Sequence, residues 1–307
     1  MKKDFISEHF EKKGLLLGGQ KDLKIENLKY QSVINDFEEY GLIIFRDFNN
    51  DPKKITSVTD LYTQSYANDA PRREKSAGEK NFNTVDVGFG DGDHEIEMPL
   101  HSEASYSPSW PEIIWFFCIT ESEQGGETTL CDGVKLWKNL SSNTKNFFLS
   151  NPICFDLEFP ILEKKLGKGR RPWMLNSQGS SDGYIDWDTG KFYVKQIRFA
   201  VHETRHPEVL AFSNHLMVIP GQDPQIKKWT TLKGNPVPSD IMEEIRSKSN
   251  DLTYDHKWKK GDLVMIDNKR FMHGRRQYNK KDKRQIAIAQ TLRANFGYGS
   301  TRRKKYS

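Results

Sequence analysis

The chain has 307 residues, a net charge of +5 and 36% apolar residues, which suits a globular enzyme with a large core. Charges of both signs are mixed along the sequence. The one basic cluster, at 302–305, does not form a basic face with interleaved aromatic residues, so we expect no nucleic-acid partner. The longest apolar run, Ile113–Ile119, is much shorter than the about 20 residues of a membrane span. The N-terminus has no apolar signal segment, and we predict a cytoplasmic protein without a membrane partner.

Three cysteines, Cys118, Cys131 and Cys154, bear on the redox state of the protein. Their number is odd and none lies in a C-x-x-C pair, so the pattern does not indicate a disulfide framework. We expect reduced thiols, as is usual for a cytosolic protein.

Hydrophobic periodicity and turn residues predict many short strands and a few helices. In the first helix, Val33, Ile34 and Phe37 recur on one side, and Gly41 ends the periodic segment. The predicted elements in chain order are a helix at 28–40, a strand at 42–45, a helix at 52–68, a mobile loop at 70–93, a strand at 111–120, a turn at 123–126, a strand at 128–131, one or two helices at 133–150, strands at 191–199 and 209–219, a helix that ends at Ile245 with Ser239 as its N-cap, and strands at 262–266 and 285–292.

This order of elements predicts a mainly β fold with helical additions. We expect the core to be a double-stranded β-helix (jelly roll) within a single domain that spans residues 1–307. The region of about 135–250 has less regular patterning, and we interpret it as an insertion that caps the active site.

Two histidines and one glutamate are candidate metal ligands. His101 and Glu103 are separated by one residue, so on a strand both side chains lie on the same face. The third ligand must come from elsewhere, and His273 is the best candidate. Two imidazoles and one carboxylate are the set that holds non-haem Fe(II) and leaves positions open for an organic co-substrate and O2. We expect the two ligand-bearing elements to lie on neighbouring strands.

Other interpretations of these residues stay open. An isolated H-x-E pair is common by chance, and two histidines and a glutamate with a water molecule would also suit a zinc hydrolase. A jelly roll that binds a ligand without a metal and without catalysis is the second alternative. The other histidines are interpreted as surface or packing residues: His9, His94, His202, His206, His215 and His256.

Three motifs together resemble the taurine dioxygenase and clavaminate synthase-like superfamily of Fe(II)/2-oxoglutarate-dependent oxygenases. The motifs are the H-S-E sequence at 101–103, the run at 124–133 with its G-G-E-T sequence, and the segment at 261–275 that contains G-D-L-V, D-N and H-G-R. Parts of the last two also resemble the γ-butyrobetaine and trimethyllysine hydroxylases. The resemblance covers about 98–133 and 258–293.

The resemblance implies roles for five residues. His101, Glu103 and His273 match the iron ligands of the family. Thr128 and Arg284 match the residues that contact the distal carboxylate of 2-oxoglutarate. The chemistry of Arg284 agrees with this role, because a guanidinium group offers a planar, permanently charged fork to a carboxylate.

One of these assignments has an alternative, and two further residues are candidates for a supporting role. Arg284 could be a surface cation in the charged run 280–284, and Arg275 would then be the fallback anchor for the carboxylate. Asp267 and Asn268 are candidates to orient His273 or to brace its strand, with a simple turn as the other interpretation.

The resemblance implies decarboxylation of 2-oxoglutarate to succinate and CO2, coupled to hydroxylation of a C–H bond by O2; some members desaturate or cyclise instead. The glutamate at 103 matches the clavaminate synthase-like branch, whereas many members carry aspartate. Ile288 occupies the position at which the taurine enzymes carry a second arginine, so taurine is not the expected substrate.

The expected partner is a small-molecule substrate, and an amino acid or amino-acid-derived metabolite is preferred by analogy. Residues 83–100 are interpreted as a possible lid, with Phe89 and Tyr106 as lining residues and Arg293 as a partner for a substrate carboxylate. The sequence does not specify an oligomeric state.

Overall fold

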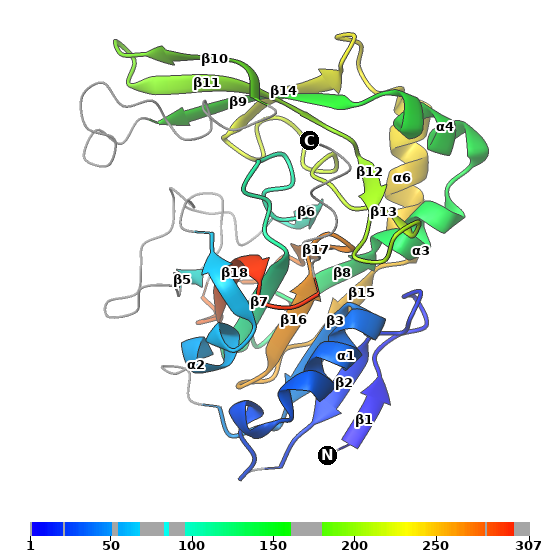
Figure 1. Ribbon diagram of the computed structural model, residues 1–307. Coiled ribbons are helices and arrows are strands. Elements are labelled where there is room, and N and C mark those ends of the chain that lie inside the picture. The colour runs from blue at the N-terminus through cyan, green and yellow to red at the C-terminus, as the bar shows by residue number, and fades with distance from the viewer. Residues whose placement is uncertain are drawn as a thin grey trace.

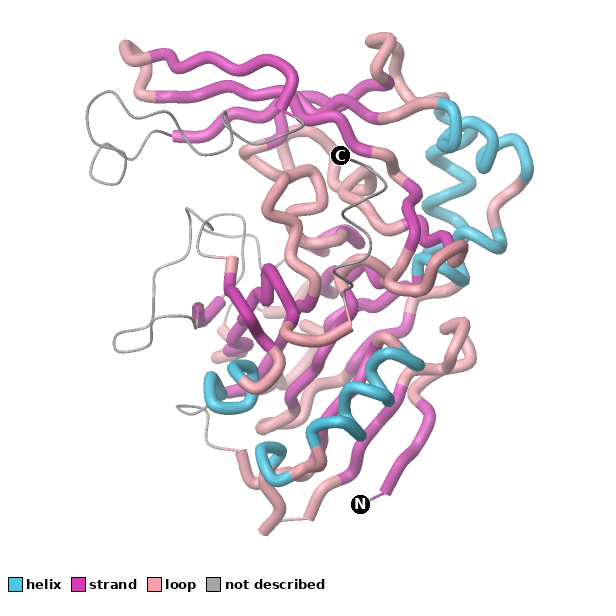
Figure 2. Tube along the Cα trace, in the orientation of Figure 1, coloured by secondary structure: helices cyan, strands magenta, loops and turns pink. Residues whose placement is uncertain are grey.

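The computed structural model describes residues 2–20, 22–50, 55–67, 83–85, 96–160, 180–279 and 281–297. Within these ranges the protein is mainly β, as predicted, with a small number of short helices (Figure 2). No helix in the described ranges is long and apolar enough to cross a membrane.

The largest sheet has eight strands in the order β1-β2-β3-β16-β7-β18-β4, and β5 pairs with β18. All neighbours are antiparallel except β2 and β3, which are parallel. Its strands are β1 (Lys2–Phe5), β2 (Leu15–Gly18), β3 (Leu42–Arg46), β4 (Thr63–Tyr66), β5 (Asn83–Val85), β7 (Ile113–Thr120), β16 (Leu263–Asp267) and β18 (Gln285–Ala294).

A smaller antiparallel sheet lies against this one, in the order β15-β8-β17-β6. Its strands are β15 (Tyr254–His256), β8 (Thr128–Asp132), β17 (Phe271–Arg275) and β6 (Met98–His101). Every residue of β8 and β17 is buried. This sheet carries three of the residues that the sequence analysis placed at the site, His101, Thr128 and His273.

Alternation along the strands of the large sheet divides its side chains between two cores. Ile43 and Phe45 point to one face, which η1 (Ile25–Asn27), α1 (Tyr30–Tyr40) and α2 (Ile55–Asp60) adjoin, whereas Ile44 points to the small sheet. Figure 1 shows α1 lying across β2 and β3. Full burial of a side chain of this size contributes about 1.5–3 kcal/mol, so both faces stabilise the sheet.

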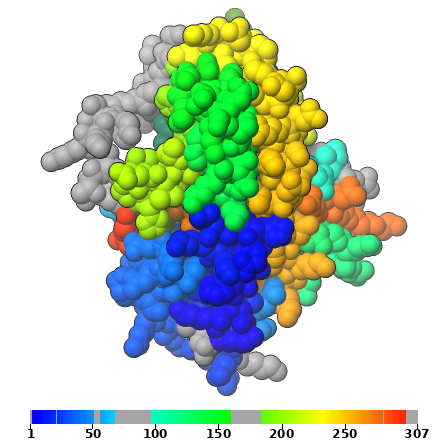
Figure 3. Space-filling model, turned by 90° about the vertical axis from the view of Figure 1, so that its right-hand side faces the viewer, coloured from blue at the N-terminus to red at the C-terminus, as the bar shows by residue number. Residues whose placement is uncertain are grey.

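A third sheet, with strand order β10-β11-β9-β14, lies apart from the other two (Figure 1). Together with a hairpin and three helices it builds a hydrophobic core, mostly from the middle of the chain, that also includes Leu100, Cys131 and Met272 of the small sheet. Its elements are α3 (Gly133–Asn139), α4 (Ser142–Ser150), β9 (Ile153–Pro160), β10 (Ser180–Asp186), β11 (Lys191–Arg198), β12 (Val201–Glu203), β13 (Leu210–Phe212), β14 (Ile226–Thr231) and α6 (Ser239–Asp251). Figure 3 shows the green segment with α3 and α4 and the gold segment with α6 above the blue N-terminal elements.

Most predicted elements are confirmed, and α1 ends as expected at Gly41, which has a φ of 69°. The predicted helix at 52–68 was wrong in its second half, because Thr63–Tyr66 pair with β18 as β4. The predicted strand at 209–219 is only three residues long, since the side chain of Asn214 accepts a hydrogen bond from the Leu216 amide and turns the chain.

Two further predictions need correction. The last helix runs on to Asp251, and its N-cap is Pro238 rather than Ser239. Of the predicted loop at 70–93, residues 83–85 form β5, and the rest lies outside the described residues. The three cysteines are free thiols, as expected.

Candidate metal centre and co-substrate cavity

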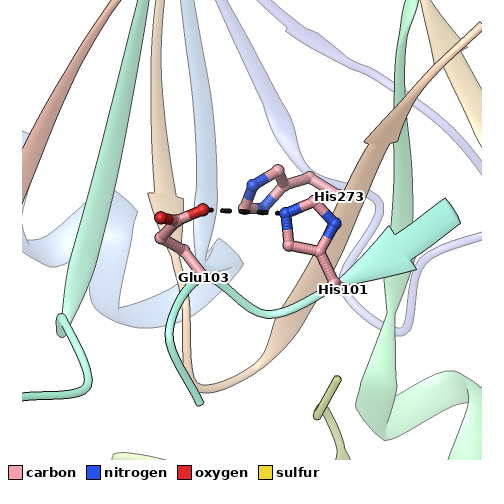
Figure 4. Close-up of side chains that lie close together, drawn as sticks. All are labelled: His101, Glu103 and His273. Carbon is pink, nitrogen blue, oxygen red and sulfur yellow. Dashed lines mark ion pairs between the residues drawn. The ribbon is translucent and has the colours of Figure 1, made fainter. Parts of the chain in front are cut away.

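Strands β6 and β17 place two histidines side by side, on neighbouring strands as predicted. In their antiparallel ladder, His101 is the register partner of His273. Directly opposed residues share a face of a sheet, and here the two ring centroids are 4.5 Å apart. Both side chains are buried. Figure 4 shows the Glu103 carboxylate directed at the two rings.

Glu103 lies just beyond the end of β6, in a turn rather than in the strand itself. The side chain of Asn268 fixes this turn from both sides: its Oδ1 accepts from the Glu103 amide at 2.9 Å, and its Nδ2 donates to the Glu103 carbonyl at 3.0 Å. The same Nδ2 donates to the Pro111 carbonyl at 3.0 Å. The carboxylate therefore approaches the histidines from a backbone that is held by hydrogen bonds.

The donor atoms of these three side chains fit a divalent cation. One ligand atom from each lies within 4.8 Å of the others, and His101 Nε2 is 3.6 Å from Glu103 Oε2. His101 Nδ1 is 2.9 Å from the Pro99 carbonyl, which can only accept, so Nδ1 carries the proton and Nε2 keeps its lone pair for a metal. Gln290 donates to Glu103 Oε1 at 2.8 Å, which leaves the other carboxylate oxygen facing His101.

A cavity opens at these residues, and its empty volume, the adjoining solvent included, is about 470 Å³. All five residues that the sequence analysis singled out line it, since Thr128 and Arg284 join His101, Glu103 and His273. Much of the remaining wall is apolar, and alternate residues of β18 contribute to it. The cavity therefore combines a metal-binding group with a cation and a hydroxyl group.

Thr128 occupies the first position of β8, opposite Arg275 in β17. Its Oγ1 accepts a hydrogen bond from the indole Nε1 of Trp258 at 3.0 Å, and both side chains are buried. A hydroxyl group has one proton besides its acceptor lone pairs. Because Trp258 uses a lone pair, the Thr128 proton is available for an anionic oxygen in the cavity.

Arg284 is only 5% exposed, which excludes the surface-cation interpretation. Its Nε donates to the Gly126 carbonyl at 2.9 Å, and no carboxylate pairs with it among the described residues. Burial and the nearby Arg275 lower the pKa of Arg284 to about 10, and Tyr278 partly offsets the shift. A buried cation without an acidic partner is costly, so this end of the cavity favours an anion.

The glycine turn before Thr128 is required by the position of this arginine. Gly126 has a φ of 70°, and a Cβ built on it would lie 2.8 Å from Cδ of Arg284. Any other residue here would have a strained backbone, and its side chain would displace the guanidinium group. The G-G-E-T sequence thus fits the close approach of the arginine as well as the position of the threonine.

Some residues proposed from sequence have other partners. Asp267 pairs with Arg205 at 3.1 Å and accepts a hydrogen bond from the Lys269 amide at 3.1 Å, which fits the interpretation as a turn residue. Asn268 does brace the site, but it holds the turn of Glu103 rather than the strand of His273.

The suggested substrate residues are not gathered at the cavity. Arg293 pairs with Glu112 at 3.2 Å, and the hydroxyl group of Tyr106 donates to Gln225 at 2.6 Å. Phe89 and most of the suggested lid lie outside the described residues.

Three contacts of the site were missed from sequence. Trp258 supports Thr128, and Gln290 orients Glu103. His215, interpreted as a surface or packing residue, packs its buried ring 5.0 Å from that of His101. Alternation along β18 could have indicated Gln290, because it is the polar residue on the face that carries Ile286 and Ile288. The other two contacts had no signal in the local sequence.

The fold and this cavity define the class of the protein: it is an oxygenase that uses Fe(II), 2-oxoglutarate and O2. A family model described as taurine catabolism dioxygenase TauD, TfdA family, matches residues 10–290. The chain belongs to this family.

Individual relatives are distant. The chain is 20% identical over 195 residues to 3-((Z)-2-isocyanoethenyl)-1H-indole synthase from Fischerella ambigua, a match that covers 62% of this chain and 61% of the relative's length. The structure of PvcB from Pseudomonas aeruginosa superimposes with a TM-score of 0.60 at 16% identity, covering 90% of this chain and 85% of PvcB. AAD-2 in complex with Mn(II) and N-oxalylglycine gives a TM-score of 0.57 at 16% identity, covering 96% and 97%. These similarities concern the fold.

Proposed function

We propose that this chain couples the decarboxylation of 2-oxoglutarate to the hydroxylation or desaturation of a C–H bond in an amino acid or amino-acid-derived metabolite. His101, Glu103 and His273 would hold the iron, and Thr128 and Arg284 would hold the distal carboxylate of 2-oxoglutarate. The observation that carries the proposal is the single cavity lined by all five residues. Bound Fe(II) supplies the activation of O2 in such a site.

The protein itself orients the iron ligands and the co-substrate, and it excludes water from the site. Pro99 fixes the tautomer of His101, while Asn268 and Gln290 fix the backbone and the carboxylate of Glu103. Arg284 and the Thr128 hydroxyl offer a charged and a neutral donor to one carboxylate, which sets the direction of the co-substrate. The buried apolar wall of β18 keeps this arrangement dry.

The architecture supports a single oxygenase domain over residues 1–307, in which the two facing sheets correspond to a double-stranded β-helix. We further propose that residues 135–250 are the insertion that caps the active site. Their own sheet, and the core through which it packs against the small sheet, are consistent with this role.

The substrate class rests on two arguments. A relative's name describes an indole that carries an isocyanoethenyl group, and PvcB is described as an Fe, alpha-ketoglutarate-dependent oxygenase from an isonitrile synthetic pathway. Ile288, which lines the cavity, offers no charge to the sulfonate of taurine. A small nitrogen-containing metabolite is therefore the preferred substrate.

The test is succinate formation from 2-oxoglutarate in air. The protein is supplied with Fe(II) and a panel of L-amino acids and their N-acyl derivatives, with Zn(II) in place of Fe(II) as the control. We expect succinate only with Fe(II), and more of it with a panel member that binds as a substrate. Hydrolysis of a substrate with Zn(II), without consumption of 2-oxoglutarate, would instead support a zinc hydrolase.

A further inference from the structure

The two oxygens of the Glu103 carboxylate have different surroundings. Oε2 lies 3.6 Å from Nε2 of His101, on the side where the three candidate ligand atoms converge. Oε1 instead accepts a hydrogen bond from Nε2 of Gln290 at 2.8 Å. Figure 4 shows the dashed line to His101 starting at one oxygen, while the other lies on the far side of the carboxylate. The carboxylate therefore presents one oxygen to a metal and the other to an amide.

Gln290 is held in place by the strand that carries it. It belongs to β18, which pairs with β7 and β4, and its register partner in β7 is Ile114. Its carbonyl accepts a hydrogen bond from the Ala67 amide at 2.9 Å, and only 7% of the residue is exposed. An ionised carboxylate can only accept hydrogen bonds, so the nitrogen of the amide must face it. The donor to Oε1 thus comes from a buried side chain on a fixed strand.

The backbone of Glu103 is fixed as well, because Asn268 bonds both its amide and its carbonyl. Rotation of the carboxylate then decides whether one oxygen or both oxygens face a metal. The hydrogen bond from Gln290 opposes the rotation that would bring Oε1 to the metal beside Oε2. A hydrogen bond to a charged group is stronger than one between neutral groups, so this contact can favour one orientation.

The number of carboxylate oxygens on the iron determines how much of the coordination sphere stays open. Two histidines and one carboxylate hold non-haem Fe(II) on one side and leave other positions free. With one atom from each residue, an octahedral ion keeps room for a chelating 2-oxo acid and for O2 together. A carboxylate bound through both oxygens fills one position more, and once 2-oxoglutarate is bound no position is left for O2.

We propose that Gln290 is a positioning residue that keeps Glu103 on the iron through Oε2 alone, so that a position for O2 stays open beside 2-oxoglutarate. This inference rests on the proposed function and adds a requirement for it. Gln290 is absent from the described residues that line the cavity. It therefore acts through the carboxylate of Glu103 and not by contact with the co-substrate.

Thr291, the next residue of β18, provides a matched control. Its hydroxyl group bonds Oγ1 of Thr63 at 2.6 Å and Nε1 of Trp115 at 3.0 Å, and the residue is fully buried. Successive residues of a strand point to opposite faces, so Thr291 points away from Glu103. Thr291→Val removes a buried polar group from the same strand and leaves the carboxylate untouched.

The experiment measures binding of nitric oxide, which takes the position of O2 without turnover, by electron paramagnetic resonance. The full chain is loaded with Fe(II) under argon and titrated with and without saturating 2-oxoglutarate. Gln290→Met keeps the length of the side chain but has no N–H donor. We expect this variant to bind nitric oxide like wild type without 2-oxoglutarate. With 2-oxoglutarate we expect binding at least about 10-fold weaker than in wild type, because a hydrogen bond to a charged group is lost.

Two further measurements separate this effect from damage to the fold. The visible charge-transfer band reports binding of 2-oxoglutarate to the iron, and we expect it in wild type and in Gln290→Met. Thr291→Val is expected to melt at a lower temperature but to bind nitric oxide like wild type in both conditions. A structure of the wild-type protein with Mn(II) and 2-oxoglutarate needs no variant, and we expect Oε2 on the metal and Oε1 still on Gln290.

Three results would overturn the inference. The first is that 2-oxoglutarate weakens nitric oxide binding no more in Gln290→Met than in wild type. The second is an equal weakening in Thr291→Val, and the third is a wild-type structure with both carboxylate oxygens on the metal. Any of these results together with a wild-type charge-transfer band would leave the proposed function standing. Absence of the band in wild type would refute the proposed function and this inference with it.

Discussion

The two facing sheets and the middle region of the chain differ in how far their polar side chains are hydrogen-bonded. In the facing sheets, strand pairing sets the register of His101 and His273, and Asn268 occupies the backbone groups of Glu103. In the middle region, Arg198 at the end of β11 uses two of its five N–H donors in the hydrogen bonds that the structure describes, to Ile197 and Gln196. Iron and 2-oxoglutarate are common to the whole class, whereas each enzyme has its own substrate. The difference teaches that the residues that carry the metal ligands are fixed by hydrogen bonds, whereas residues that would meet an organic ligand, Thr128 and Arg284 in the cavity among them, keep donors available.

The largest expected effect comes from removing the carboxylate ligand in the facing sheets. Glu103→Ala is expected to lower 2-oxoglutarate turnover by more than about 100-fold, since even supporting residues of metal sites are worth 10- to 100-fold. Glu103→Asp keeps a carboxylate and should retain part of the activity. Succinate release with Fe(II) is the measurement. Equal activity of Glu103→Ala and wild type would show that the facing sheets do not hold the iron through this residue.

The next effect tests the cation of the cavity. Arg284→Met is expected to weaken binding of 2-oxoglutarate by about 2–5 kcal/mol, or at least about 30-fold, because a buried charged hydrogen bond is lost. Lys283→Met removes an exposed charge one residue earlier and is the control. The concentration of 2-oxoglutarate needed for half-maximal turnover is measured. A similar rise in both variants would contradict a specific role of Arg284 in binding 2-oxoglutarate.

A smaller effect is expected where a side chain only braces the turn. Asn268→Ala removes the hydrogen bonds of this side chain to the Glu103 amide and carbonyl, to the Pro111 carbonyl and to the Ser102 hydroxyl group, which are worth about 0.5–1.5 kcal/mol each. We expect about 10- to 100-fold weaker iron binding and a lower melting temperature. Asn139→Ala, at an exposed helix end, is the control. Unchanged iron affinity would show that the turn does not depend on this amide.

The smallest expected effect concerns the support of the co-substrate threonine. Trp258→Phe keeps the ring but removes the N–H group that donates to Thr128. Loss of one such hydrogen bond corresponds to about 0.5–1.5 kcal/mol, or about 2- to 10-fold weaker binding of 2-oxoglutarate. We expect little change in kcat. A selective fall in kcat, with 2-oxoglutarate binding unaltered, would contradict an action through Thr128.

Local sequence patterns predicted many of the helices and strands. The apolar run of β7 and the spacing of Val33, Ile34 and Phe37 in α1 depend on residues close in sequence, and both elements formed as expected. By contrast, Thr63–Tyr66 became a strand because β18 lies beside it. The periodicity of one segment does not predict its pairing with a strand that is distant in sequence.

The same distinction holds within the site. The five site residues were named from motifs, and the structure gathers them in one cavity. Trp258, His215 and Asn268 act across more than 100 residues on Thr128, His101 and Glu103, respectively. Arg198 lay in a segment without a recognisable motif. That no carboxylate of the described residues pairs with it becomes visible only when the neighbouring strands and turns are in place.

The most direct test of the central claim is anaerobic addition of Fe(II) and 2-oxoglutarate to the wild-type protein and to His273→Ala. A weak visible charge-transfer band is predicted for wild type when both components are present, and its loss is predicted for His273→Ala. A wild-type protein without the band, or a variant with an undiminished one, would contradict an iron site built from His101, Glu103 and His273.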